Sequence, residues 1–111
     1  MTPEQFVARL GKPEHQFADT LSFIEQHYHY QPSAFANGAV HNTEDQNQGS
    51  CKVLAPAQDL QLTDLQTLQC FAEHYRSVLD NPTGSDHANI RAFMNSGLNA
   101  VSFNRQPLTR R

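Results

Sequence analysis

The chain has 111 residues, of which 38% are hydrophobic and 17% charged, and its formal net charge is −3 at pH 7. This length predicts one domain, residues 1–111, able to bury an adequate core without disulfides or metal. Seven phenylalanines and three tyrosines argue against a disordered chain, and the acidic balance argues against a nucleic-acid-binding protein, which would carry a basic face.

No apolar run approaches the roughly 18 residues of a membrane span, so no membrane partner is expected. The first ten residues lack the basic and apolar segments of a secretory signal peptide, which predicts a cytoplasmic protein. Cys51 and Cys70 are then expected to be reduced thiols. A Cys51–Cys70 disulfide is the alternative, and the fold does not require one.

Two helices are predicted at the start of the chain. The first begins at Thr2, because Thr2 and Gln5 can form a capping box around Pro3, and it ends where Gly11 precedes Pro13. The second runs from about residue 13 to residue 28, because apolar residues recur there at helical spacing: Phe17, Leu21, Ile24 and Tyr28. Pro32 stops this helix at or before Gln31.

The stretch from Tyr28 to Lys52 has little helical or alternating periodicity, and we expect a long central loop there. Loops of this length are usually either functional or disordered. Asn37-Gly38 marks a turn, since both residue types accept a positive φ. The apolar run after Gly49-Ser50 is too short to assign, so residues 51–55 form either a strand or the first turns of a helix.

The clearest helix is predicted from Thr63 to about Leu79. Thr63 and Gln66 form a second capping box, and a core-facing stripe follows: Leu65, Leu68, Ala72, Tyr75 and Leu79. Asp86 is expected to cap the last helix, with Ile90, Phe93 and Met94 facing inward and Gly97 at its end. Residues 101–103 alternate and predict a short strand or hairpin. The fold class is therefore α+β: a small, mainly helical domain of four to five helices, with a short β element near the C-terminus and a long central loop.

The histidine and cysteine spacing gives little support for a metal site. His27 and His29 point to different faces of a helix, so they do not match the HExxH arrangement. Cys70 and His74 share a helix face, but a zinc site needs further ligands that no nearby spacing supplies. We interpret Cys70 as a buried core residue and His74 as a partly exposed one, and we expect neither a metal nor a cofactor.

Cys51 is the most suggestive single residue. If a helix begins at Ser50, its N-terminus and Lys52 lower the thiol pKa, and a histidine could act as a base with an asparagine orienting it. His29, His41 and His87 are the candidate bases. The competing interpretation is a buried cysteine that acts as a small apolar residue. We favour it because no protease or transferase signature surrounds Cys51.

Motifs along nearly the whole chain form one recognisable set. They are Asn37-Gly38, Asn42, Asn47, Gly49-Ser50-Cys51-Lys52, Cys70-Phe71, Tyr75, Gly84-x-Asp86-His87-x-Asn89-Ile90-Arg91-x-Phe93-Met94, and the ending Gly97…Val101-x-Phe103…Pro107-Leu108. Together they resemble the HopJ type III effector family. The chain departs from the family pattern at Thr43–Gln46 and at Pro56, which leaves open the backbone shape of the loop and a helix just after Lys52.

The resemblance implies a small, mainly helical α+β domain and an uncharacterised, effector-type protein that binds a protein partner, a host protein if it is secreted. It implies no catalytic residues. The family is named after proteins that plant-pathogenic bacteria deliver through a type III secretion apparatus, but similar proteins occur in other bacteria. The first eleven residues here predict a capped helix instead of a flexible polar signal, which favours residence in the bacterial cytoplasm over secretion.

Three hypotheses remain open. The protein binds another protein through exposed tyrosine and histidine side chains around Pro32; or it is a small enzyme or ligand-binding protein; or its polar loop residues are purely structural. In the second hypothesis Arg91 binds a carboxylate or phosphate, its alternative being a structural ion pair. The candidate binding residues lie outside the core stripes: Asn37, Asn47, Ser50, Cys51, Lys52, Asp86, His87, Asn89 and Arg91. Such a site is expected at the ends of the loop, facing the helix that starts near Asp86.

Overall fold

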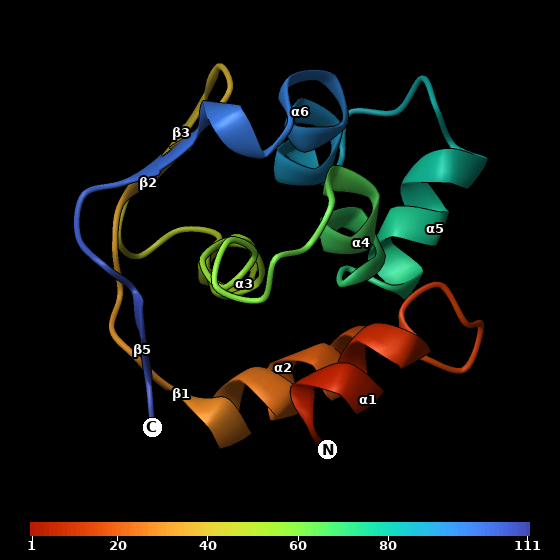
Figure 1. Cartoon of the computed structure of the whole chain (residues 1–111). Helices are drawn as coiled ribbons and strands as arrows, with labels where there is room; N and C mark the ends of the chain where they lie inside the picture. Colours follow the sequence, from red (N-terminus) through yellow and green to blue (C-terminus); the bar gives the residue numbers. More distant parts are fainter.

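The computed structural model describes residues 1–111 as six α-helices, a 3₁₀ turn and five short strands. Their order is α1 (Pro3–Arg9), α2 (Phe17–His27), β1 (Tyr28–Tyr30), β2 (Phe35–Asn37), β3 (Val40–Asn42), α3 (Gln48–Leu54), α4 (Asp64–Gln69), α5 (Glu73–Asp80), α6 (Ala88–Ser96), η1 (Leu98–Ala100), β4 (Val101–Phe103) and β5 (Leu108–Arg110). Figure 1 shows α3 at the centre, α1 and α2 below it, α4 and α5 to its right, α6 above it and the strands along the left. The predicted α+β class is confirmed.

Two helices begin at the capping boxes that the sequence predicts. Thr2 Oγ1 accepts a hydrogen bond from the backbone N–H of Gln5 (3.1 Å), and Gln5 Oε1 accepts one from the N–H of Thr2 (2.9 Å). Thr63 and Gln66 form the same reciprocal pair at the start of α4. Each box satisfies two backbone donors that the helix itself leaves free.

The long helix predicted from Thr63 is broken at Ala72, and this break is one reason for the larger number of helices. Ala72 has φ 52° and ψ −119°, so the chain turns there and restarts as α5. Because the chain changes direction at this turn, the predicted apolar stripe no longer faces the core along its whole length. The first and last residues of the stripe are exposed: Leu65 is 55% exposed and Leu79 50%. Met94 of α6, also expected inside, is 44% exposed. The second helix starts at Phe17 instead of residue 13.

The central stretch contains three strands and the start of a helix, so the expectation of one long loop is wrong for most of its length. Asn37-Gly38 forms the predicted turn, with Gly38 at φ +58°, and joins β2 to β3 as a hairpin. The order of that sheet is β3-β2-β4, while β1 pairs separately with β5, all antiparallel. Residues 51–54 are helical, within α3.

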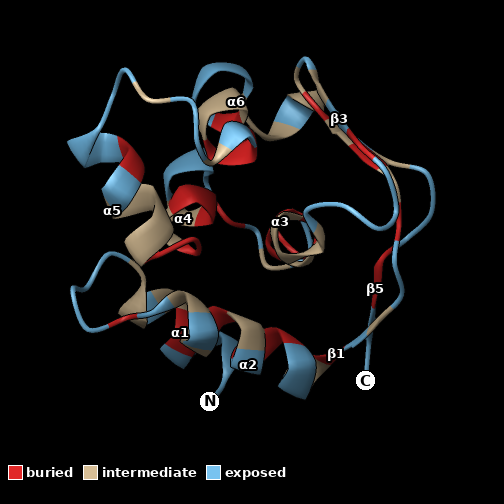
Figure 2. Cartoon of the chain, turned by 180° about the vertical axis from the view of Figure 1, so that it is seen from behind, coloured by how far each residue is buried: buried red, intermediate tan, exposed pale blue.

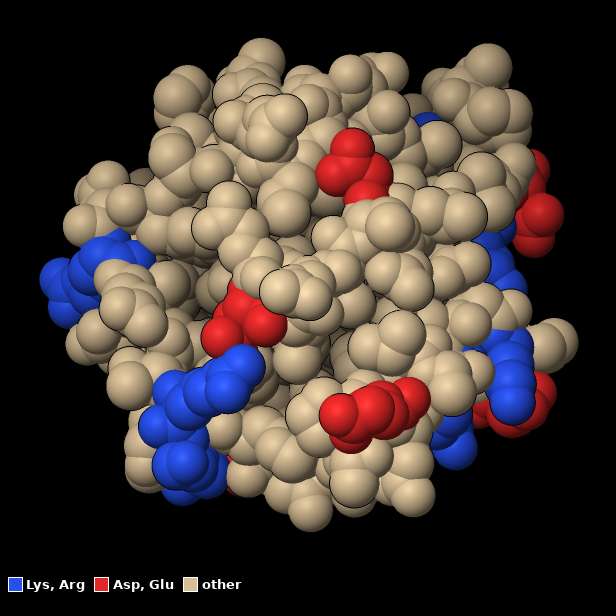
Figure 3. All heavy atoms as spheres, in the orientation of Figure 1, with Lys and Arg blue, Asp and Glu red and all other residues tan.

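The core surrounds α3, whose Cys51, Val53 and Leu54 are buried. Figure 2 shows the buried residues on the sides of the helices and strands that face this centre. Phe6 of α1 stacks on Phe23 of α2, with ring centroids 4.1 Å apart, and this contact pairs the first two helices. Uncharged atoms cover most of the face drawn in Figure 3. None of the helices has the length and hydropathy needed to cross a membrane.

Candidate functional site

Four asparagines link the β2–β3 hairpin to α3 and α6. Asn37 Nδ2 donates to the backbone carbonyl of Asn89 (2.8 Å) and to its Oδ1 (3.1 Å). Asn42 and Asn89 exchange two side-chain hydrogen bonds, of 3.2 and 3.0 Å, and Asn47 Nδ2 donates to Asn42 Oδ1 (2.8 Å). Asn37, Asn42 and Asn89 are buried. Buried amides stabilise a fold when they are hydrogen-bonded to one another, so this network fixes α6 relative to the hairpin.

A hollow of about 210 Å³ opens beside this network, where α3, α5 and α6 begin. We call it the histidine hollow. Its lining comes from four segments of the chain and consists of Phe17, Asn47, Gly49, Ser50, Phe71, His74, His87, Asn89 and Ile90. The aromatic and aliphatic members provide apolar walls, and the others bring amide, hydroxyl and imidazole groups to the same space. No acidic side chain belongs to the lining.

The two histidine rings lie next to each other in the lining of this hollow. Their ring centroids are 5.1 Å apart, and the rings of His74 and Phe17 pack edge to face with their centroids 4.8 Å apart. No hydrogen bond fixes either imidazole; the nearest acidic atom to His87 is Asp86 Oδ2 at 4.0 Å. Glu73, at the start of α5, is engaged elsewhere: its Oε1 accepts the N–H of Phe17 at 2.6 Å. Burial works to raise the pKa of Glu73, but this bond helps to hold it below its usual value.

The backbone around the hollow adopts a conformation that side chains rarely favour. Asn47 and His87, the N-cap residues of α3 and α6, both have φ 52° in the left-handed region, as does Ala72 before α5 at φ 52°. Asparagine and histidine tolerate this region better than alanine. None of the three makes a side-chain capping bond. The surrounding packing therefore holds these turns, and they place His74 and His87 next to each other.

The structure brings together four of the nine candidate binding residues: Asn47, Ser50, His87 and Asn89 all line the histidine hollow. Asn37 lies behind it in β2 and reaches it only through Asn89. The remaining candidates, Cys51, Lys52, Asp86 and Arg91, are not part of the lining.

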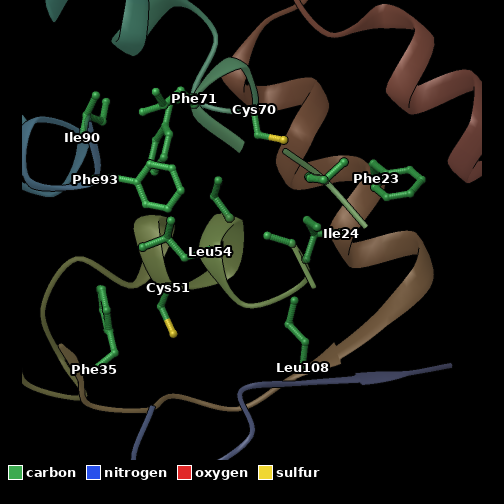
Figure 4. Close-up of a cluster of buried hydrophobic side chains, with 14 of the residues drawn as sticks. Phe23, Ile24, Phe35, Cys51, Leu54, Cys70, Phe71, Ile90, Phe93 and Leu108 are labelled. Carbon is green, nitrogen blue, oxygen red and sulfur yellow. The ribbon is translucent and has the colours of Figure 1, made fainter. Parts of the chain in front are cut away.

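Cys51 does not meet the conditions for an activated thiol. It is fully buried, and burial raises the pKa of its thiol to about 11, against smaller opposing effects of the Ser33 backbone and Lys52. Figure 4 shows its sulfur pointing from α3 toward the strands, away from Phe71 and Phe93. Lys52 points elsewhere as well, with its Nζ 4.5 Å from the centroid of the Tyr30 ring. Cys51 is thus a core residue, as the competing interpretation proposed.

Asp86 and Arg91 form a structural pair. The prediction that Asp86 caps α6 is wrong, because His87 holds the cap position. Asp86 Oδ1 instead accepts a hydrogen bond from Arg91 Nη2 at 2.7 Å, which lowers the pKa of the Asp86 carboxyl. The Arg91 guanidinium also donates to the backbone carbonyls of Asn81, Pro82 and Asp86. These bonds tie down the loop before α6, so the alternative of a structural ion pair describes Arg91.

Nowhere in the chain do three His, Cys, Asp or Glu side chains converge closely enough to hold a metal ion. Cys51 and Cys70 are free thiols. Burial raises the pKa of Cys70 to about 12, while His74, one turn later, lines the histidine hollow. Sequence reasoning gave His74 no part in a site, because the break at Ala72 that orients it has no local signal. Asn42 was also missed, although the family pattern contains it.

Two comparisons with known proteins place the chain. Residues 3–108 match the profile of the family described as HopJ type III effector protein. The chain belongs to the HopJ type III effector family. This HopJ chain is also similar to unknown function protein VPA0580, whose crystal structure superposes with a TM-score of 0.92 at 38% sequence identity, over 100% of this chain and 95% of that one. No curated protein matches it. The HopJ fold is thereby established, without an activity attached to it.

Proposed function

We propose that this HopJ protein binds a small anionic ligand in the histidine hollow. The observation that carries the proposal is that Ser50, His74 and His87 line one hollow without a hydrogen bond to any protein group from their side chains. A few convergent polar groups set among apolar walls are a common mark of a binding site.

The charge of the lining favours an anion over a cation. Imidazole N–H groups and hydroxyls donate hydrogen bonds to carboxylate or phosphate oxygens, and bonds to an ionised acceptor are stronger than neutral ones. No carboxylate lines the hollow. Of the two carboxylates nearby, Glu73 accepts the N–H of Phe17, and Asp86, whose Oδ2 is 4.0 Å from His87 Nε2, is paired with Arg91. The small volume and the apolar walls of Phe17, Phe71 and Ile90 suit a compact acid, with its charged end at the histidines. A nucleophilic role for Cys51 is not part of the proposal.

Titrations with inorganic phosphate and with acetate, followed by NMR of the backbone amides, test this function. We expect the shifts to concentrate at residues 49–50, 74 and 87–89. His74→Gln or His87→Gln should weaken binding about tenfold, whereas His41→Gln, on the exposed side of the hairpin, should leave it unchanged. Equal binding by all three variants would refute the proposal.

Family membership supports a second candidate, an effector that acts on a protein partner. The exposed tyrosines expected around Pro32 do not support it, since Tyr28 is buried and Tyr30 Oη donates to Gln48 Oε1 at 2.5 Å. Exposed apolar side chains at Leu65, Leu79 and Met94 offer contact area instead. A reporter fused to the N-terminal segment separates the two proposed locations: translocation through a type III system indicates secretion, and its absence leaves residence in the bacterial cytoplasm.

A further inference from the structure

A second hollow, of about 470 Å³, shares no lining residue with the histidine hollow. It opens between the start of α1, the end of α2, the loop before α4, and β5. We call it the terminal hollow. Figure 3 shows basic side chains gathered at the lower left, where Figure 1 has the end of β5, with acidic groups near them on the same face. Its size falls in the range typical of small-molecule sites.

One charged pair at the terminal hollow is already satisfied. Asp59 Oδ2 accepts hydrogen bonds from Arg110 Nε (2.7 Å) and from the Tyr28 hydroxyl (2.5 Å). These three side chains join β5, the loop before α4 and β1 into one rim. The charges of Asp59 and Arg110 neutralise each other, so neither is the first choice for an incoming ion.

Two further charges of opposite sign line the same hollow and have no ion-pair partner. Glu4 of α1 makes no salt bridge, and its carboxylate accepts no side-chain hydrogen bond. Arg111 donates from Nε to the carbonyl of Glu25 (2.8 Å) and contacts His29 through Nη1 (3.2 Å), which leaves Nη2 free. Its guanidinium is thus positioned while its charge remains uncompensated by any acidic side chain.

We propose that the terminal hollow binds a short zwitterionic peptide of about two residues. Its carboxylate meets the Arg111 guanidinium, its ammonium group meets Glu4, and an apolar side chain lies against Leu60 and Phe23. Glu4 and Arg111 come from different elements of the rim, and a dipeptide, about 7 Å long when extended, carries its two charges at opposite ends. Gln61, also in the lining, is held at φ 56°. A non-glycine residue in that region is kept there by its surroundings, often beside a binding site.

The test compares three peptides on the unmodified protein: alanylphenylalanine, its N-acetyl form and its C-terminal amide. Backbone amide shifts at Leu60 and Gln61 report binding. We expect the free dipeptide to bind about tenfold more tightly than either blocked form, since each block removes one charge-assisted contact. Glu4→Gln should abolish the effect of acetylation, and Arg111→Gln the effect of amidation. Arg105→Gln, whose side chain pairs with Glu44, is the matched control and should change nothing.

Equal binding of the three peptides would overturn the proposal, as would the absence of shifts at Leu60 and Gln61 at saturating peptide. Unchanged affinity in both Glu4→Gln and Arg111→Gln would overturn it too. Because the peptides are compared on the unmodified chain, the result does not depend on whether a variant folds. Phosphate binding at the histidine hollow uses other residues, so the failure of either proposal is recognised separately.

Discussion

Replacing Asn89 by alanine tests whether the asparagine network holds α6 in place. The substitution removes three side-chain hydrogen bonds: one from Asn37 Nδ2 (3.1 Å), one from Asn42 Nδ2 (3.2 Å) and one to Asn42 Oδ1 (3.0 Å). Asn89 is only 4% exposed, so water does not readily replace them.

The expected loss in the free energy of unfolding depends on the hydrogen bonds that remain after the substitution. Asn37 Nδ2 keeps the backbone carbonyl of residue 89, Asn42 Nδ2 keeps the carbonyl of Phe35, and Asn42 Oδ1 keeps Asn47. No buried donor or acceptor is therefore newly orphaned, and each lost bond counts at its net value of about 1 kcal/mol. Alanine has a higher helix propensity than asparagine, which offsets about 0.5 kcal/mol of this loss in stability. We expect the free energy of unfolding to fall by about 2–3 kcal/mol, and Tm by about 10 °C.

Urea denaturation followed by circular dichroism measures this difference. Asn95→Ala is the matched control, because Asn95 lies in the same helix, is exposed and makes no side-chain hydrogen bond. It should change stability by less than about 0.5 kcal/mol. A loss below about 1 kcal/mol for Asn89→Ala would show that the network contributes little and that apolar packing alone positions α6.

Three further outcomes follow from the same structure. At about pH 8 the thiol of Cys51 should react with iodoacetamide about a hundredfold more slowly in the folded protein than in urea, because its raised pKa leaves few thiolates. Mass spectrometry of the peptides measures the labelling. Rapid labelling of the folded protein would contradict the burial of Cys51. Burial and Arg9 lower the pKa of His15 below 6.5, so the unfolded chain takes up the proton first as the pH falls. The stability that His15 contributes above pH 6.5 is therefore lost as the pH falls through its folded-state pKa. Thermal melts should show this loss in His41→Gln but not in His15→Gln. Gly38→Ala should lower the free energy of unfolding, measured by urea denaturation, by about 1–2 kcal/mol, because Gly38 has a positive φ and a Cβ there would approach Ser96 Oγ to 2.6 Å. Gly49→Ala is the control: Gly49 has an ordinary φ and its Cβ would meet its nearest neighbour at 3.4 Å, so its stability should change by less than about 1 kcal/mol. Equal losses in the two variants would contradict the argument.

Features that depend on a few adjacent residues could be predicted from the sequence. The capping boxes at Thr2 and Thr63 and the turn at Asn37-Gly38 depend on local chemistry, and each is confirmed. The break at Ala72 could not be predicted, because alanine is a good helix former and the apolar stripe continues through it. Tertiary packing imposes that turn. The central strands, three residues each, are too short to show a period.

The candidate site was predictable in part for the same reason. Polar residues outside the core stripes, together with the family motifs, pointed to the ends of the central stretch and to the start of α6, where Asn47, Ser50 and His87 line the histidine hollow. Sequence spacing could not tell that Cys51, the neighbour of Ser50, points into the core. Nor could it tell that Arg91 binds the loop before its own helix. Both outcomes depend on the direction of a side chain, which helical position fixes only after the helix is placed against its neighbours.

The pairing of β1 with β5 joins segments about eighty residues apart, Tyr28 lying opposite Arg110. Such a contact forms late, because a long loop must close before any bond rewards the closure. A nascent chain cannot complete this ribbon until nearly all of it has left the ribosome. The free thiols mean that no covalent link fixes the chain once it has folded. The ribbon therefore closes the fold through hydrogen bonds and packing alone, and it can open again whenever the protein unfolds.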